Sequence, residues 1–325
     1  MEPVVFEVVP GITAIDTFMG GRERYTAAYL IEGRDPTLIE TGPTTSVEPV
    51  ARALGSLGIS PDGLANVVLT HIHLDHAGGI GGLATRFPAA TVHVHERGAR
   101  HLVDPTRLVA SATRVYGQEH MARLFGPVEP VAADRIRVLT DHATVDVGGR
   151  VLEVLDTPGH ASHHVAILDG ASGVAFTGDA LGIHVPDLPV LRPATPPPDF
   201  DLELAVRSIH AIRERRPTAL LFAHFGPIAE ADRTCELAER RLRDWCDAVS
   251  DALDDTDDLD AIVERLGRYV ADELVTGAEA QLDLERLETL SSIRMNATGI
   301  VRYLTRLREA RAPGDAGTAP PAQPS

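Results

Sequence analysis

The stretch Thr70-His71-Ile72-His73-Leu74-Asp75-His76-Ala77-Gly78-Gly79 guides the interpretation of this sequence. Three imidazoles and one carboxylate fall within six residues of it, at His71, His73, Asp75 and His76. Apolar residues before it are typical of a buried strand, and the segment from Ala77 to about Phe87 is typical of a helix. We therefore expect the cluster on a strand-to-helix loop, where a scaffold holds ligands and leaves them reachable. Imidazoles with a carboxylate suit zinc or a similar divalent ion, so the stretch predicts a metal site.

The composition is that of a globular protein with a strong negative charge. The chain has 325 residues, 44% of them hydrophobic, and a formal net charge of −17. This length allows one large domain or one domain with a smaller appendage. A negative field repels phosphate backbones, which argues against a nucleic-acid partner. The two cysteines, Cys235 and Cys246, are expected to be thiols on a helix.

Export and membrane signals are missing from the sequence as it stands. The N-terminal residues are acidic and lack a basic segment followed by an apolar core. No run approaches the ~18 consecutive apolar residues that a membrane-spanning helix needs. We therefore expect a soluble, cytoplasmic protein.

Short β-like runs alternate with helical patterns over the first two thirds of the chain. The runs are rich in β-branched residues and lie between Gly, Pro, Asp or Asn, over residues 4–9, 27–31, 37–40, 67–70, 91–95, 151–155 and 165–168. Apolar residues at helical spacing predict helices over residues 47–57 and 202–215. The mixture predicts an α/β fold in which helices cover sheets.

Two segments interrupt this alternation, and we expect them to form the walls of a pocket. Residues 101–125 carry apolar side chains in a helical setting and are predicted to form an inserted flap. The proline-rich stretch 187–200 has no periodicity and is predicted to be a loop.

The last third of the chain is helical in pattern. Apolar stripes begin at Cys235, Leu259 and Leu284, with an acidic break over residues 251–260, and the third stripe runs past Gly299 to Leu307. We divide the chain into a catalytic domain (1–228), a helical extension (229–311) and a tail (312–325). The tail is rich in Pro, Ala and Gly and is predicted to be disordered.

Further potential ligands follow other strand-like runs. They stand in Thr157-Pro158-Gly159-His160, in Thr177-Gly178-Asp179 and in Ala223-His224. Each motif places a His or an Asp where a strand becomes a loop. Loops from one edge of a sheet can converge on a single site.

These motifs, taken in order, make the chain resemble the metallo-β-lactamase superfamily, whose signature H-x-H-x-D-H matches His71–His76. Five motifs carry the resemblance over about residues 4–228: Leu38-Ile39-Glu40-Thr41-Gly42, His71–Gly79, Thr157–His160, Thr177–Asp179 and His224. The glyoxalase II and lactonase-like branch is the most similar in pattern. The resemblance implies an αββα sandwich with a binuclear metal site at one edge of the sheets.

The resemblance also implies a set of metal ligands. The first ion would be bound by His71, His73 and His160, the second by Asp75, His76 and His224, and Asp179 would bridge both. The cofactors expected are two divalent ions, with zinc first and iron or manganese as alternatives.

Four more residues are candidates for supporting roles or substrate contact. Glu40 replaces the usual Asp of its motif, so its partner is open. His164 follows the Thr157–His160 motif and is expected to support or pack against the ligands. His184 lies shortly after Asp179 and is a candidate for substrate contact, and Tyr116 in the flap could donate a hydrogen bond to a carbonyl oxygen.

The resulting hypothesis is a binuclear metal-dependent hydrolase. A metal-bridging hydroxide would attack a thioester, lactone or related acyl bond, with Asp75 and Asp179 as catalytic carboxylates that orient it.

An iron-dependent oxidoreductase or persulfide dioxygenase, a phosphodiesterase and a non-enzymatic module on the same fold remain alternatives. The expected partner is a small acyl compound, with neither nucleic acid nor membrane. Whether the C-terminal helices cap the pocket, form a homodimer, or do both is left open.

Overall fold

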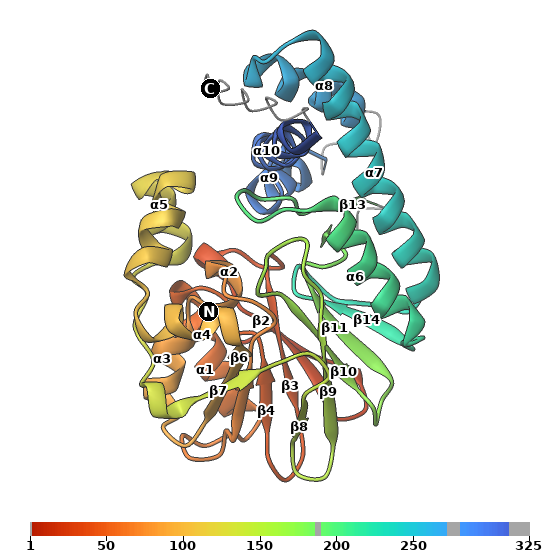
Figure 1. Cartoon of the computed structure of the whole chain (residues 1–325). Coiled ribbons are helices and arrows are strands. Elements are labelled where there is room, and N and C mark those ends of the chain that lie inside the picture. The colour runs from red at the N-terminus through yellow and green to blue at the C-terminus, as the bar shows by residue number, and fades with distance from the viewer. Residues whose placement is uncertain (1, 186–189, 272–279, 312–325) are drawn as a thin grey trace, which may run out of the picture.

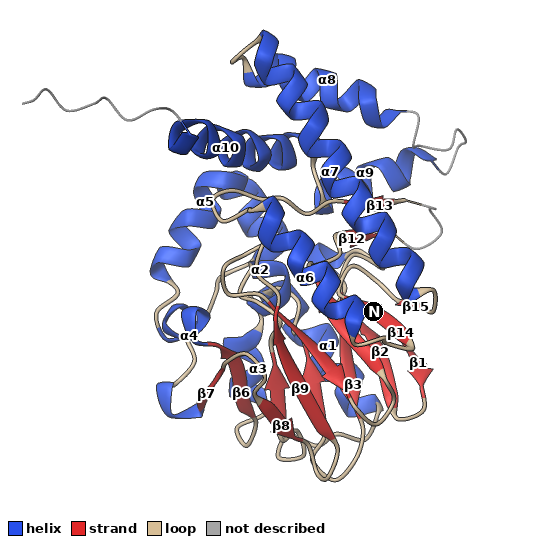
Figure 2. Ribbon diagram, turned by 45° about the vertical axis from the view of Figure 1, so that its right-hand side comes forward, coloured by secondary structure: helices blue, strands red, loops and turns tan. Residues whose placement is uncertain are grey.

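The protein is built from two β-sheets that lie face to face between layers of helices (Figures 1 and 2). The computed structural model describes residues 2–185, 190–271 and 280–311. The predicted tail, residues 312–325, and part of the proline-rich loop lie outside these residues. The expectation of an αββα sandwich is confirmed.

The first sheet is formed by the N-terminal half of the chain and has seven strands in sequence order. They are β1 (Val5–Val9), β2 (Ile12–Asp16), β3 (Ala27–Ile31), β4 (Thr37–Ile39), β5 (Asn66–Val68), β6 (Thr91–His95) and β7 (Ile136–Leu139). The pairs from β1 to β4 are antiparallel, and those from β4 to β7 are parallel. Helices provide the crossovers that the parallel pairs need.

The second sheet has six strands in the order β15-β14-β11-β10-β9-β8. They are β15 (Pro227–Ile228), β14 (Ala219–Phe222), β11 (Val174–Gly178), β10 (Val165–Asp169), β9 (Val151–Asp156) and β8 (Thr144–Asp146). β11 and β14 are parallel, while the other neighbours are antiparallel. A small separate hairpin joins β12 (Ile183–His184) to β13 (Leu191–Arg192).

Helices cover the outer faces of the two sheets and also lie beyond one edge of them (Figures 1 and 2). The helices are α1 (Val47–Ser56), α2 (Leu74–Ala77), α3 (Ile80–Arg86), α4 (Glu96–Val103), α5 (Thr106–His120), α6 (Leu202–Glu214), α7 (Ala231–Asp255), α8 (Leu259–Ala271), α9 (Ala280–Leu290) and α10 (Ile293–Arg311). Of these, α5, α8, α9 and α10 lie beyond that edge of the sheets. A π-helical turn, η3 (Met121–Phe125), follows α5, and three 3-10 turns complete the set: η1 (Met19–Gly21), η2 (Thr44–Ser46) and η4 (Ala133–Arg135).

Alternation along the strands explains why both faces of each sheet are buried. In β3, Tyr29 and Ile31 enter the core between the sheets, whereas Leu30 packs under α1 and α3. Successive side chains of a strand point to opposite faces, so apolar residues at every position need cover on both sides. The outer face of the second sheet is covered by α6 and α7, where Trp245 is fully buried.

The strands predicted from the sequence are present, but β2, β7 and β8 were missed, as were the two-residue strands β12, β13 and β15. β2, β7 and β8 are short and carry Thr, Arg or Asp among their apolar residues. A run of three to five residues of this kind is too short for periodicity to separate it from a loop. Pairing with the neighbouring strands decides these elements.

The predicted flap is helical, as expected, and consists of the end of α4, all of α5 and η3. The segment after the motif differs from its prediction, because its helix begins at Leu74 and not at Ala77. Asp75 and His76 therefore lie on the first turn of α2, where the carbonyl of His73 accepts the backbone N–H of Ala77.

The third C-terminal stripe was predicted as one helix and is in fact two. α9 ends at Leu290 and α10 begins at Ile293. Ser292 accepts the backbone N–H of Met295 at 3.0 Å, which caps the new helix, and Glu288 accepts that of Ile293. The acidic break is also shorter than expected, because α7 continues to Asp255.

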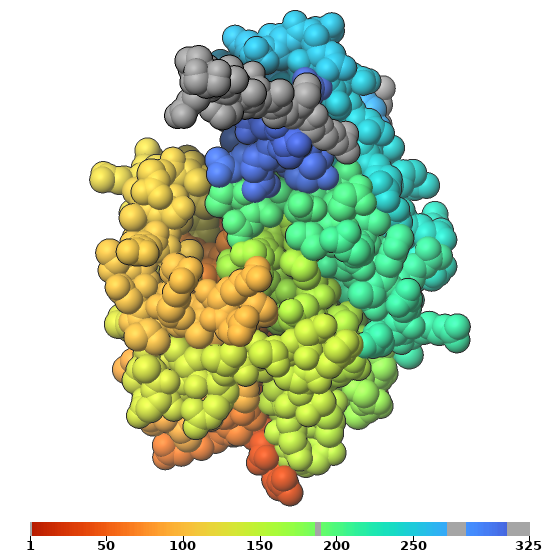
Figure 3. Space-filling view, viewed as in Figure 1, coloured from red at the N-terminus to blue at the C-terminus, as the bar shows by residue number. Residues whose placement is uncertain are grey.

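The helices α7, α8 and α10 share one apolar core with the second sheet. The junction between α9 and α10 faces the flap across a hollow on the molecular surface (Figure 3). Among the described residues, no helix has the length and apolar character to span a membrane.

The side chain of Asn296 ties α10 to the proline-rich loop. Its Oδ1 accepts the backbone N–H and the hydroxyl of Thr195, both at 2.7 Å, and its Nδ2 donates to Ser291 and Ser292. Both Asn296 and Thr195 are buried.

Asn296→Ala should therefore leave the buried N–H of Thr195 without an acceptor. We expect a loss of about 2 kcal/mol in the free energy of unfolding, measured by urea denaturation. Thr298→Ala, at a half-buried position of the same helix, is the control and should change little. Equal unfolding midpoints for N296A and the unmodified protein would contradict this role.

Candidate metal centre

The potential ligands gather at one edge of the two sheets, where several strands end. β4 leads to Glu40, β5 to His71, β9 to His160, β11 to Asp179 and β14 to His224. β4 and β5 are parallel, as are β11 and β14, so within each sheet the loops leave at the same end. Because the sheets are stacked, the two sets of loops meet, and the N–H of Val165 in the second sheet donates to the carbonyl of Thr70 in the first at 2.8 Å.

One group of potential ligand atoms comes from His71, His73 and His160. One ring nitrogen of each lies within 4.8 Å of the others. Nε2 of His160 is 2.8 Å from Nδ1 of His73. The first ligand trio expected from the sequence is thus brought together in space.

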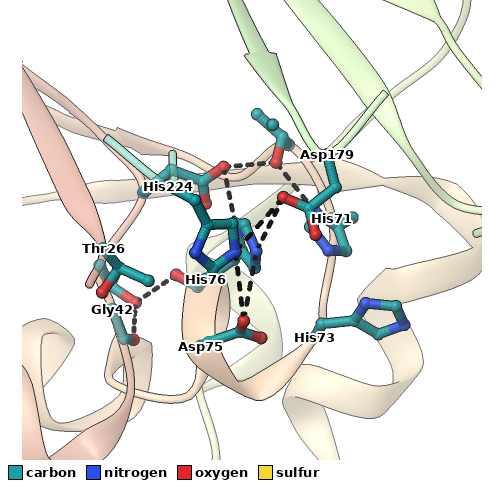
Figure 4. Close-up of polar contacts among 12 residues, drawn as sticks. Thr26, Gly42, His71, His73, Asp75, His76, Asp179 and His224 are labelled. Carbon is teal, nitrogen blue, oxygen red and sulfur yellow. Dashed lines mark hydrogen bonds and ion pairs between the residues drawn. The ribbon is translucent and has the colours of Figure 1, made fainter. Parts of the chain in front are cut away.

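A second group comes from Asp75, His76 and His224. Their ligand atoms also lie within 4.8 Å of one another. Oδ2 of Asp75 is 3.4 Å from Nε2 of His224 and 3.7 Å from Nε2 of His76. Figure 4 shows these side chains turned toward one another. This is the second expected trio.

Asp179 stands between the two groups and presents one carboxylate oxygen to each (Figure 4). Its Oδ2 is 3.4 Å from Nε2 of His160, while its Oδ1 is 3.4 Å from Nε2 of His76 and 3.5 Å from Nε2 of His224. This is the arrangement that a carboxylate shared by two cations requires.

Hydrogen bonds on the far side of the rings determine which nitrogen faces the centre. Nδ1 of His160 donates to the carbonyl of Ala194 at 2.9 Å, and Nδ1 of His224 donates to that of Tyr25 at 3.0 Å. A carbonyl oxygen can only accept, so each ring keeps an Nε2 lone pair for the site.

Glu40 orients His71 through the hydroxyl of Thr70. The Thr70 hydroxyl donates to Oε1 of Glu40, so its oxygen accepts the Nδ1 proton of His71 at 3.0 Å. The same Oε1 is 3.5 Å from Nδ1 of His76. The sequence left the partner of Glu40 open. In the structure Glu40 contacts both Thr70 and His76. Glu40, His71 and His76 also form a third group with ligand geometry.

His164 holds the loop that carries Asp179. Its Nε2 accepts the backbone N–H of Asp179 at 3.0 Å, and its Nδ1 donates to the Thr157 hydroxyl at 2.7 Å. Gly178 allows this close approach, since a Cβ there would lie 2.5 Å from Nε2 of His164. His164 thus contacts the backbone of Asp179.

Burial lowers the pKa of His71 and of His73, and neighbouring histidines lower both further, so both rings stay neutral. Burial alone would raise the pKa of Asp179, but His76, His224 and His160 outweigh it and hold the carboxyl well below its usual range. Burial alone would lower the pKa of His76 and of His224, but Asp179 and Asp75 outweigh it and raise the pKa of both. Neutral imidazoles and ionised carboxylates are the protonation states that bind metal, so binding of a cation would displace protons from these two rings.

Buried polar atoms without a partner show that these residues fit a metal. Among the described residues, His71 Nε2, both ring nitrogens of His76, Asp179 Oδ1 and His224 Nε2 have no hydrogen bond. Such atoms cost about 1–3 kcal/mol each when buried. Coordination to divalent cations would satisfy the atoms that converge on the site, which are His71 Nε2, His76 Nε2, Asp179 Oδ1 and His224 Nε2, whereas Nδ1 of His76 faces Glu40.

A profile of the Metallo-beta-lactamase superfamily matches residues 21–224. The chain belongs to this superfamily. A curated relative, the metallo-beta-lactamase fold-containing protein ST1585 of Sulfurisphaera tokodaii, is 30% identical over 52% of this chain and 63% of its own length. A hydroxyacylglutathione hydrolase of Synechococcus is 30% identical over 47% of this chain and 48% of its own. The crystal structure of ST1585 aligns with a TM-score of 0.65 at 23% identity, covering 90% of this chain and 98% of that one, which shows a shared fold.

A cavity of about 420 Å³ opens over the metal-binding groups of this superfamily member. His73, Asp75, His160 and Asp179 lie on its floor, and the flap, the proline-rich loop and the junction of α9 and α10 form its walls. The predicted role of the flap and the loop as pocket walls is confirmed. The C-terminal helices, whose role the sequence left open, also contribute to these walls.

The two remaining candidates have different surroundings. Tyr116 lines the cavity, with its hydroxyl 3.7 Å from the sulfur of Met295, and burial raises the pKa of that hydroxyl. His184 is not among the cavity-lining residues; its Nδ1 donates to the carbonyl of Phe225, next to His224. His184 therefore lies outside the lining of this cavity, and its contact with substrate stays a prediction.

Asp179→Ala should remove the carboxylate that faces both histidine groups. We expect the purified variant to lose most bound metal, and His71→Ala to lose a substantial part, as measured by elemental analysis. His142→Asn is the control: His142 is an exposed residue with a φ of 59°, which Asn tolerates. Retention of two equivalents of metal by D179A would contradict the bridging position.

Glu40→Gln should keep the size of the side chain while removing its charge beside His76. Changing a group that supports a ligand typically weakens metal affinity about 10- to 100-fold. We expect a loss of this size in zinc titrations against a competing chelator. Arg86 forms a surface ion pair with Glu48, so Glu48→Gln provides a matched control that should leave affinity unchanged.

Proposed function

We propose that the protein is a binuclear metal-dependent hydrolase that cleaves a carbonyl-type bond, a thioester or a lactone. The observation that carries the proposal is the position of Asp179, whose two oxygens face two separate groups of ligands at the floor of a cavity. A structural metal site is closed by its protein ligands, whereas here Asp75 and Asp179 line an open pocket.

Two divalent ions in this position would lower the pKa of a bound water from 15.7 toward ~7 and would polarise a carbonyl oxygen. The residues of the chain supply the remaining requirements. Asp75 and Asp179 can orient the attacking water and accept its proton, because both carboxylates reach the floor of the cavity. The Tyr116 hydroxyl in the wall can donate to the oxygen of the substrate carbonyl.

The cavity suits a small acyl compound. A volume of about 420 Å³ lies within the usual range for small-molecule sites. Leu108, Ala112 and Val115 from the flap face Leu290 and Met295 from the C-terminal helices and make the walls partly apolar. The name of the Synechococcus relative, a hydroxyacylglutathione hydrolase, also points to thioester chemistry. Zinc as the native metal and a cytoplasmic location remain part of the proposal.

The test is hydrolysis by protein loaded with two equivalents of zinc, iron or manganese. We expect turnover of a thioester or a lactone in a panel of S-acyl glutathione, acyl-CoA, N-acyl homoserine lactone, nitrocefin and bis-p-nitrophenyl phosphate. A chelator should abolish the activity, and added metal should restore it. Cleavage of the phosphodiester alone would overturn the proposal, as would oxygen consumption with two bound irons and no hydrolysis.

A further inference from the structure

Three arginines line the cavity without a part in the chemistry described above. Arg97 and Arg100 project from α4 and Arg107 from α5. All three are exposed, whereas His160 and Asp179 on the floor are buried, so the arginines mark the open end. This rim is the orange-to-yellow border of the hollow in Figure 3.

None of these guanidinium groups forms an ion pair with a carboxylate within the described part of the chain, taking 4.0 Å as the limit. Arg97 donates to the carbonyl of Ser162 at 3.3 Å, and Arg100 donates to Nε2 of His101 at 3.2 Å. Both contacts leave further N–H donors of each guanidinium for a ligand.

Carboxylates are abundant on this protein, in which acidic residues outnumber Lys and Arg by 47 to 30. Many of its surface arginines pair with one, as in Arg213–Asp232 at 2.6 Å, Arg215–Glu153 at 2.8 Å and Arg308–Asp254 at 2.6 Å. The protein as a whole has a net charge of −17 and repels anions. The positive rim therefore concentrates the attraction for anions at the mouth of the cavity.

Apart from the metal-binding carboxylates, Asp199 is the one acidic side chain among the described residues that line the cavity. Its Oδ2 accepts the hydroxyl of Ser162 at 2.6 Å and the backbone N–H of Ser162 at 3.2 Å. It is therefore engaged by the loop that follows His160. The cavity thus has a cationic mouth, partly apolar walls and a floor of metal-binding groups.

We propose that the substrate is an acyl thioester whose thiol half ends in phosphate groups, which the three arginines bind at the mouth. This inference rests on the proposed hydrolase function. Water adds to the acyl carbon at the floor, the C–S bond breaks, and the products are a carboxylic acid and a thiol that carries the remaining proton. The guanidinium fork matches phosphate oxygens in pairs.

Phosphate fits this rim better than the carboxylates of a peptide thiol. Three exposed cations suit a multiply charged group that stays partly hydrated, whereas each of the two carboxylates of glutathione carries one charge and occupies one fork. A peptide such as glutathione also carries an ammonium group that needs an acidic partner. The remaining carboxylate of the cavity, that of Asp199, is already held by Ser162.

Three thioesters with the same acyl group separate these possibilities: acyl-CoA, acyl-pantetheine, which lacks the phosphates, and S-acyl glutathione. We expect kcat/KM to be about tenfold higher for acyl-CoA than for acyl-pantetheine at low salt, and the advantage to shrink as salt screens it. The triple variant Arg97→Gln, Arg100→Gln, Arg107→Gln should lose this advantage through KM and leave acyl-pantetheine unaffected.

Arg34→Gln is the matched control, because Arg34 is exposed in the loop before β4, at the opposite edge of the sheets. Equal values for the two pantetheine-based substrates would overturn the inference, as would a preference for acyl glutathione that the triple variant loses.

Binding of adenosine 3′,5′-bisphosphate by calorimetry gives a readout that is independent of turnover. We expect the unmodified protein and R34Q to bind it and the triple variant to lose about tenfold or more in affinity. Equal binding by all three would overturn the phosphate site. Binding that depends on the arginines, without hydrolysis of any thioester, would keep the phosphate site and reject the hydrolase.

Discussion

The structure depends on the burial of two carboxylates and five imidazoles in one small volume at the edge of two sheets. Charged groups are rarely buried unless they are paired or coordinate a cation. Here Asp75 and Asp179 are balanced by the histidines around them, and burial keeps His71 and His73 neutral. The concentration of anionic and lone-pair groups makes this edge a binding site for divalent cations and therefore a place for hydrolytic chemistry.

Such a cluster needs a rigid support, which the sandwich provides. Apolar residues at successive positions of the central strands bury both faces of each sheet, so the strand ends cannot move independently. A layer of hydrogen bonds then orients the histidine rings, which donate to the hydroxyl of Thr70 and to the carbonyls of Ala194 and Tyr25. The precision of the site comes from this layer, while the fold supplies the approximate positions.

The walls of the pocket come from parts of the chain that supply none of the metal-binding side chains. The flap and the junction of α9 and α10 enclose the space above Asp75 and Asp179, and α4 and α5 add the arginine rim. In the proposed function, the site of the superfamily supplies the chemistry and the added helices shape the space for the substrate. This separation is common, because a fold supplies a site and its surrounding segments supply specificity.

Much of this was available in the sequence. The spacing of His71, His73, Asp75 and His76, and the positions of His160, Asp179 and His224 after apolar runs, predicted both the fold and a shared metal site, because these signals are local. The start of α2, the break between α9 and α10, the partner of Glu40 and the distance of His184 from the cavity were decided only in the tertiary structure. So were the contribution of the C-terminal helices and the grouping of Arg97, Arg100 and Arg107 at one mouth. Each of these depends on contacts between segments far apart in the chain, and no pattern within a single segment encodes such a contact.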